Sequence, residues 1–167
     1  MSIEKAKAYL SALGFADHII ELAASTATVA EAAQALGVQP GMIAKTMSFL
    51  QGDKAVLILT EGTAKVDNRK YKDTFHMKAK MIPFGDVERL IGHAPGGVCP
   101  FALPENVKTY LDVSLRRFDT VFPAAGSANS AIEMSCEELE RCSSGFTAWV
   151  DVCRGWRPEE NGEEGAQ

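Results

Sequence analysis

Apolar residues recur along this chain at helical and at strand-like intervals in turn. Near the N-terminus, Ile3, Ala6, Leu10 and Leu13 lie three or four positions apart, which places them on one face of a helix. Similar helical patterns, most of them bounded by a capping residue or a glycine, span 28–36, 67–75, 85–91 and 135–142, with a helical turn at 115–118. The pattern therefore predicts several short helices rather than one long bundle.

Short apolar runs between these helices predict strands. A strand is predicted at 55–60, whose residues 56–59 are apolar without alternation, which is typical of a central strand covered on both faces. Gly52 supplies a turn that joins it to 46–50 as a hairpin. Further strands are predicted at 78–82, 107–113, 120–123, 131–134 and 146–152. We expect an α/β fold: a single domain with a mixed, mostly antiparallel sheet of six or seven strands flanked by helices.

The C-terminal composition sets the expected domain boundary. From Arg154 the chain is rich in Gly, Glu, Pro and Asn, and its last ten residues carry four glutamates and no basic residue. Such a segment has too little apolar surface to fold on its own. We predict one domain over 1–153 and a flexible acidic tail over 154–167.

Overall composition excludes several classes of protein. Apolar residues make up 46% of the chain, charged residues 23%, and no run is long and apolar enough to cross a membrane. The N-terminal residues lack the apolar core of a secretory signal, so a cytoplasmic protein is expected. The four cysteines and three histidines show no metal-ligand spacing, and we expect neither a metal nor a cofactor.

The charge distribution is uneven. A net charge of −5 disfavours indiscriminate binding to nucleic acid, and we expect no DNA partner. Six basic residues nevertheless gather in one stretch: Lys65, Arg69, Lys70, Lys72, Lys78 and Lys80. This stretch fits either a partner that offers a few phosphates or a solvated helix face.

Residues 92–100, Gly-His-Ala-Pro-Gly-Gly-Val-Cys-Pro, form the most distinctive segment. Its three glycines and two prolines exclude a helix or a regular strand. The backbone amides around Gly96, Gly97 and Val98 are candidates to hold an oxyanion or a carboxylate. The alternative is a tight structural connection between two elements.

Two side chains are candidates for chemistry. Lys45 lies beside an apolar strand, where partial burial would direct its charge at a bound anion; alternatively, it extends outward into solvent. Cys99 lies in the glycine-rich loop with His93 six residues before it, as a thiolate nucleophile and its partner would, or as a small thiol that only packs. Signatures of serine hydrolases and nucleotide-binding loops are missing.

Several segments together resemble the YbaK family, the free-standing relatives of the editing domain inserted in bacterial prolyl-tRNA synthetases. They are 43–46 (Ile-Ala-Lys-Thr), 66–72 (Val-Asp-Asn-Arg-Lys-Tyr-Lys), 92–100, 110–112 (Tyr-Leu-Asp) and 123–127 (Pro-Ala-Ala-Gly-Ser). The resemblance extends from about Ala24 to Cys153. It implies the family's fold and a trans-editing hydrolase, which deacylates tRNA carrying a wrong small amino acid such as Ala, Ser or Cys, with tRNA(Pro) as the expected carrier.

The resemblance also implies roles for individual residues. The family's near-invariant lysine falls on Lys45, and its Gly-x-x-x-Pro motif falls on 96–100. Catalysis is assigned to Lys45, Gly97 and Val98; substrate binding to Thr46, His93, Gly96, Cys99, Pro100 and Ser127; and tRNA binding to Arg69, Lys70 and Lys72. In related deacylases water attacks the ester, assisted by a substrate group. The implied partners are the 3′ end of aminoacyl-tRNA and an aminoacyl-tRNA synthetase.

Three points stay open at this stage. His76 stands where relatives commonly have glycine, and it either alters the edge of the site or caps the preceding helix. The edited amino acid, among Ala, Ser, Cys and Thr, depends on pocket details that a sequence does not give. Two alternative functions are a non-catalytic tRNA- or synthetase-binding module and a thiol hydrolase that uses Cys99.

Overall fold

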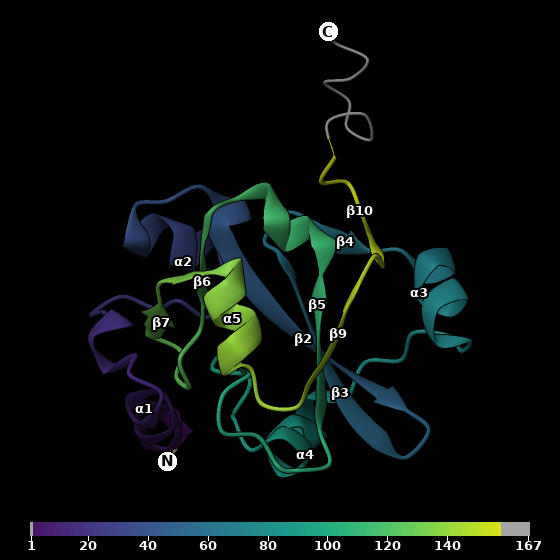
Figure 1. Ribbon diagram of the computed structural model, residues 1–167, viewed down its shortest axis with the longest axis horizontal. Helices are drawn as coiled ribbons and strands as arrows, with labels where there is room; N and C mark the ends of the chain where they lie inside the picture. Colours follow the sequence, from purple (N-terminus) through teal and green to yellow (C-terminus); the bar gives the residue numbers. More distant parts are fainter. Residues whose placement is uncertain (1, 158–167) are drawn as a thin grey trace, which may run out of the picture.

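The computed structural model describes residues 2–157, which form short helices around a central sheet (Figure 1). The α-helices are α1 (Ser2–Ala12), α2 (Val29–Leu36), α3 (Asn68–Phe75), α4 (Val87–Ile91) and α5 (Cys136–Cys142). Single 3₁₀ turns are η1 (Ala16–His18), η2 (Pro40–Met42), η3 (Phe84–Asp86) and η4 (Val113–Arg117). No helix within the described residues is long and apolar enough to cross a membrane.

The strands form one large and two small sheets. They are β1 (Ile19–Glu21), β2 (Ile43–Gln51), β3 (Lys54–Glu61), β4 (Lys65–Val66), β5 (Lys108–Asp112), β6 (Thr120–Pro123), β7 (Ser130–Ile132), β8 (Met134–Ser135), β9 (Phe146–Val150) and β10 (Cys153–Arg154). The large sheet has the order β8-β6-β2-β3-β5-β9, and β1 pairs with β7 and β10 with β4. The expected mixed sheet is confirmed, with six strands among the described residues.

Parallel pairing is more frequent in the large sheet than the sequence suggested. The β2–β3 hairpin and the β6–β8 pair are antiparallel, whereas β2–β6, β3–β5 and β5–β9 are parallel. The described part of this sheet is therefore not mostly antiparallel. The reason is that α3 and α4 lie in the connection from β3 to β5, and a long crossover of this kind returns the chain in the same direction.

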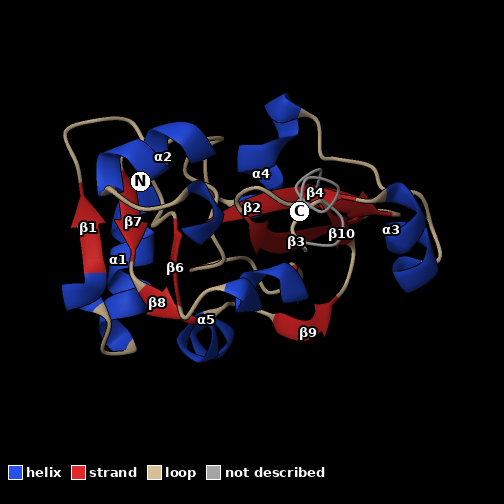
Figure 2. Cartoon of the chain, turned by 90° about the horizontal axis from the view of Figure 1, so that it is seen from above, coloured by secondary structure: helices blue, strands red, loops and turns tan. Residues whose placement is uncertain are grey.

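Strand β3 is central, as its uninterrupted apolar run predicts. Val56 and Ile58 pack on one face with Phe49 and Tyr71, while Leu57 packs on the other face with Ile82, Ile91 and Val107. Figure 2 shows α4 on one side of the sheet and α5 on the other. Because both faces are covered, β2 and β3 give a rigid base for whatever site their neighbours build.

Two segments differ from the prediction. The expected strand at 78–82 makes only an isolated bridge between Met81 and Phe49, since the chain bends away at Pro83. Near the C-terminus, Arg154 of β10 lies opposite Lys65 of β4 in an antiparallel strand pair. Trp156 packs against the core cluster around Tyr71. Residues 158–167 of the expected tail lie outside the described residues.

His76 caps helix α3 in the left-handed conformation, with φ of 62°. Its N–H donates to the carbonyl of Lys72 at 2.7 Å, so the residue ends the helix and does not line the cavity described below. Because a side chain is strained in this conformation, we expect His76→Gly to raise the free energy of unfolding by about 1 kcal/mol. Urea denaturation measures the change, and His76→Ala is the control that should give no gain. An equal gain from alanine would contradict the explanation.

Candidate functional site

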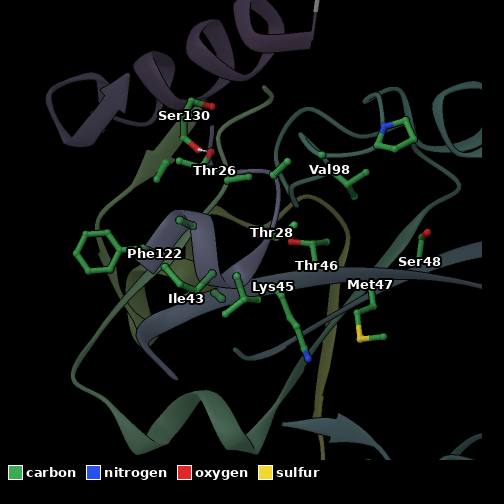
Figure 3. Close-up of a pocket in the computed structure, with 18 of the residues that line it drawn as sticks. Thr26, Thr28, Ile43, Lys45, Thr46, Met47, Ser48, Val98, Phe122 and Ser130 are labelled. Atoms are coloured by element: carbon green, nitrogen blue, oxygen red, sulfur yellow. Dashed lines mark hydrogen bonds between the residues drawn. The ribbon is translucent and has the colours of Figure 1, made fainter. Parts of the chain in front are cut away.

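A cavity of about 250 Å³ opens between α2, the first half of β2, strand β7 and the loop at 95–98 (Figure 3). One part of its wall carries hydroxyl groups, from Thr26, Thr28, Thr46, Ser48 and Ser130. Another part is apolar and includes Val29 and Ala32 of α2 together with Ile43 and Phe122. The cavity can thus hold a small molecule that has both a polar and an apolar end.

The alternation of β2 sends Lys45 and Thr46 to opposite sides of the sheet. Figure 3 shows the Lys45 side chain pointing away from Thr28 and Val98, although its base lines the cavity. Its ammonium donates to the carbonyl of Ala64 at 2.6 Å. Among the described residues no carboxylate lies within ion-pair distance of it, so its charge is not neutralised by a direct ion pair.

Burial is the main influence on this ammonium group. It lowers the pKa of Lys45, while the nearby Cys153 and Glu61 oppose that shift and Lys65 adds to it. The sequence-based expectation of a partly desolvated lysine beside an apolar strand matches this environment. The assigned role at the substrate, however, requires the side chain to leave Ala64 or to act through its field from behind β2.

Thr46 faces the cavity with an unsatisfied hydroxyl. Its Oγ1 is buried and has no hydrogen-bond partner among the described residues. Buried polar groups are nearly always paired, and an exception in a cavity wall indicates a missing ligand or water. Thr46 therefore has the strongest structural indication of ligand contact among the predicted site residues.

The 92–100 loop contributes backbone amide groups to the cavity wall. The N–H of Gly97 donates to the carbonyl of Ala94 at 3.0 Å, so this amide closes a turn and is not free for an oxyanion, contrary to the expected role of Gly97. Gly96 and Val98 line the cavity, and their N–H groups have no acceptor within the described part of the chain. Of the three amides singled out from the sequence, these two are available to a ligand.

Gly97 instead permits a close approach of two loops. A Cβ added to it would lie 2.8 Å from backbone atoms of Gly126 and Ser127, a distance that real Cβ atoms essentially never show. Ser127 in turn lies one contact from the cavity, because its hydroxyl donates to Oγ of Ser130 at 2.9 Å. The two loops form a single unit at this edge of the cavity.

His93, Cys99 and Pro100 lie behind the loop and do not line the cavity. Cys99 Sγ is 3.4 Å from His93 Nε2, so the two side chains meet as a thiol–imidazole pair would. Both are fully buried, and burial raises the pKa of Cys99 to about 12 and lowers the pKa of His93. A thiol with that pKa, shielded from the cavity, is a packing group and offers no support for a thiol hydrolase.

The three predicted tRNA-binding residues are not equivalent. Lys70 donates to the carbonyl of Cys153 at 2.8 Å and pairs with Asp151 at 3.4 Å, so it fastens the C-terminal strand to α3. Arg69 and Lys72 line a surface depression together with Lys78. Figures 1 and 2 place α3 toward the opposite end of the long axis from α2, so these cations lie apart from the cavity.

Sequence reasoning missed four hydroxyl-bearing residues of the wall, Thr26, Thr28, Ser48 and Ser130. Ser48 repeats the polar position of Thr46 two residues later on β2, a period-two signal that was available in the sequence. Thr28 was recognisable as the N-cap of α2, yet its contribution to a cavity was not, and the same holds for Ser130 in β7. No group of three or more His, Cys, Asp or Glu among the described residues is arranged to hold a metal ion.

The amino-acid sequence of this chain matches that of a known protein family. The sequence model of the aminoacyl-tRNA editing domain matches residues 23–142, and the chain belongs to this family. The matched range includes β2, the glycine-rich loop and β7, and with them every residue that lines the cavity.

Individual relatives agree with this assignment. The chain is 44% identical over 157 residues to "Uncharacterized protein YwhH" of Bacillus subtilis, covering 93% of this chain and 99% of that protein. It is 27% identical over 121 residues to the "Putative Cys-tRNA(Pro)/Cys-tRNA(Cys) deacylase EbsC" of Enterococcus faecalis, covering 71% and 73%. A solved structure described as "a putative trans-editing enzyme for prolyl tRNA synthetase" superposes with a TM-score of 0.81 at 30% identity, covering 92% and 98%.

Proposed function

We propose that this protein is a trans-editing deacylase that hydrolyses the ester between a wrongly attached small amino acid and the 3′-terminal ribose of a tRNA. Alanine, serine and cysteine are the candidate amino acids, and tRNA(Pro) is the expected carrier. One observation carries the proposal: residues from two separate motifs, Thr46 on β2 and Gly96 and Val98 in the loop, line a single cavity. Membership of the editing-domain family and the deacylase named among the relatives support it.

The reaction needs little from side-chain chemistry. Water adds to the ester carbonyl, the bond to the ribose oxygen breaks, and that oxygen takes up the proton, so that free amino acid and tRNA are released. Negative charge develops on the carbonyl oxygen in between, and hydrogen-bond donors fixed beforehand stabilise it. We assign this role to the N–H groups of Gly96 and Val98. The unpaired Thr46 hydroxyl would bind another polar atom of the substrate.

Lys45 supplies positive charge to the same reaction in this proposal. Its ammonium is half-buried and held by a single carbonyl, and no carboxylate among the described residues pairs with it directly. Exchange of that hydrogen bond for a phosphate oxygen of the terminal nucleotide would hold the 3′ end in place. Charge in a partly buried position also acts over a longer range than charge in water.

The test is release of amino acid from Ala-, Ser- and Cys-tRNA(Pro) by the wild type and by Lys45→Met, which removes the charge and keeps most of the stem. We expect hydrolysis of at least one substrate, and a loss of about tenfold or more in kcat/KM for the variant. Cys99→Ala should retain the wild-type rate, because the buried thiol takes no part. No hydrolysis of any substrate by a wild type that still binds tRNA would replace the proposal with a binding module.

A further inference from the structure

Phe84 and Met81 stand out of the surface beside the cavity. Their side chains are 79% and 53% exposed, the two highest values among the exposed large apolar residues of the described chain. The segment that carries them is nevertheless firmly held. Ile82 and Val87 on either side of Phe84 are buried, and Ile82 N–H donates to Ser48 O at 3.1 Å. The exposed ring is thus presented by a fixed turn, η3.

This turn lies at the rim of the cavity. Met81 and Val87 both belong to the cavity wall, and Phe84 lies between them in the chain. An aromatic ring here has no packing partner in the core, although burial would remove a large apolar area from water. The ring is therefore free to contact a molecule that occupies the cavity.

Two cations, Lys78 and Lys80, precede Met81 in the chain, whereas Phe84 follows it. Lys78 lines the depression with Arg69 and Lys72, and Met81 follows Lys78 by three positions, which is at most about 11 Å of chain. Among the described residues, no carboxylate pairs with Lys78 or Lys80. Near Phe84 the charge of Asp86 is offset by Arg89 at 3.1 Å. Along the long axis, α4 lies between α2 and α3 (Figures 1 and 2).

We propose that Phe84 and Met81 form a stacking platform for a base at the 3′ end of the RNA whose ester enters the cavity, with Lys80 and Lys78 contacting the phosphates that precede it. Aromatic rings beside a row of unpaired cations are typical of surfaces that hold single-stranded nucleic acid. In this arrangement the cavity binds the ester, Phe84 and Met81 stack on the base, and the cations contact the phosphates in the direction of α3. This proposal rests on the proposed function, since that function supplies the RNA.

The experiment compares binding of two forms of deacylated tRNA(Pro), one complete and one trimmed of its 3′ CCA. We expect Phe84→Ala to weaken binding of complete tRNA about tenfold and to leave the trimmed tRNA unaffected, a size typical of the loss of one stacked base. Phe84→Trp, which keeps an aromatic ring at this position, should bind complete tRNA as tightly as the wild type does. Leu13→Ala is the matched control, because Leu13 is also a large apolar residue, is 44% exposed and does not line the cavity, so its loss should have no effect.

The cations have their own readout. Each phosphate contact to a single strand adds about 0.7 to the slope of log Kd against log salt concentration. We expect Lys80→Gln to reduce that slope by about this amount with complete tRNA. Lys108→Gln, an exposed lysine at the start of β5, should leave the slope unchanged.

The outcomes separate the two proposals. Equal binding of wild type and Phe84→Ala to complete tRNA, equal losses with complete and trimmed tRNA, or a wild type that binds neither would overturn the platform. A loss that depends on the CCA end, in a protein that hydrolyses none of the mischarged tRNAs, would support the platform and reject ester hydrolysis. A role of Phe84 toward a protein partner would appear as unchanged tRNA binding and counts against the proposal.

Discussion

Replacement of Gly97 by alanine is expected to lower kcat/KM for the mischarged tRNA at least a hundredfold in a protein that still folds. The added methyl group would lie 2.8 Å from the carbonyl carbon of Gly126 and from two backbone atoms of Ser127. Backbone on both sides can relieve this contact only if one loop moves, and the Gly96 and Val98 amides would move with it. A misplacement of about 1 Å at a catalytic centre can cost a factor of about a hundred.

The matched control is Gly85→Ala. A methyl group on Gly85, in the turn η3, would meet nothing within 4 Å, so this variant tests the effect of alanine at an uncrowded glycine, and Phe84 beside it keeps its side chain. Steady-state deacylation kinetics measure both variants, and circular dichroism checks that each is folded. Near-wild-type activity of Gly97→Ala would mean that the position of this loop does not matter to the reaction. The assignment of the Gly96 and Val98 amides would then be withdrawn.

Local pattern was sufficient to predict most elements of the fold. The apolar run at 56–59 identified a strand covered on both faces, and Ser135 with Glu138 forms the capping box expected at the start of α5. The segment at 78–82 was mispredicted because its apolar residues are used to anchor a turn rather than to extend a ladder. A mixed sheet was predicted correctly, but its share of parallel pairs was underestimated, since pairing direction depends on where the crossover helices pack.

The motifs that build the site could be predicted from the sequence, but the directions in which their side chains point could not. The motifs at 45–46 and 96–98 do meet at one cavity, which a linear pattern anticipates only through resemblance. Which of two adjacent residues faces that cavity depends on strand register, and so Lys45 turned out to point away while Thr46 points in. In the same way, Cys99 and His93 are neighbours in space, but only the fold reveals that both are sealed from the cavity.

Removal of the Arg117 side chain is expected to destabilise the protein more than neutralisation of its partner, Glu61. Glu61 is 0% exposed and accepts hydrogen bonds from the backbone and hydroxyl of Thr63, while Arg117 Nη1 lies 2.7 Å from its second carboxylate oxygen. Arg117→Ala leaves this carboxylate buried without its direct ion-pair partner, which costs about 3 kcal/mol, at the lower end for such pairs because Arg117 itself is 41% exposed.

Glu61→Gln leaves no buried charge, unlike Arg117→Ala. The amide keeps the shape of the carboxylate, and the guanidinium that loses its partner can turn to water, so we expect a loss of about 1 kcal/mol. Urea denaturation measures both variants, and equal losses would contradict the asymmetry. The pair also links to the site, because Glu61 is one of the groups that oppose the lowering of the Lys45 pKa. Glu61→Gln should therefore lower the pKa of Lys45 further. Because Lys45 then loses its positive charge sooner as the pH rises, the deacylation rate should begin to fall at a lower pH than in the wild type.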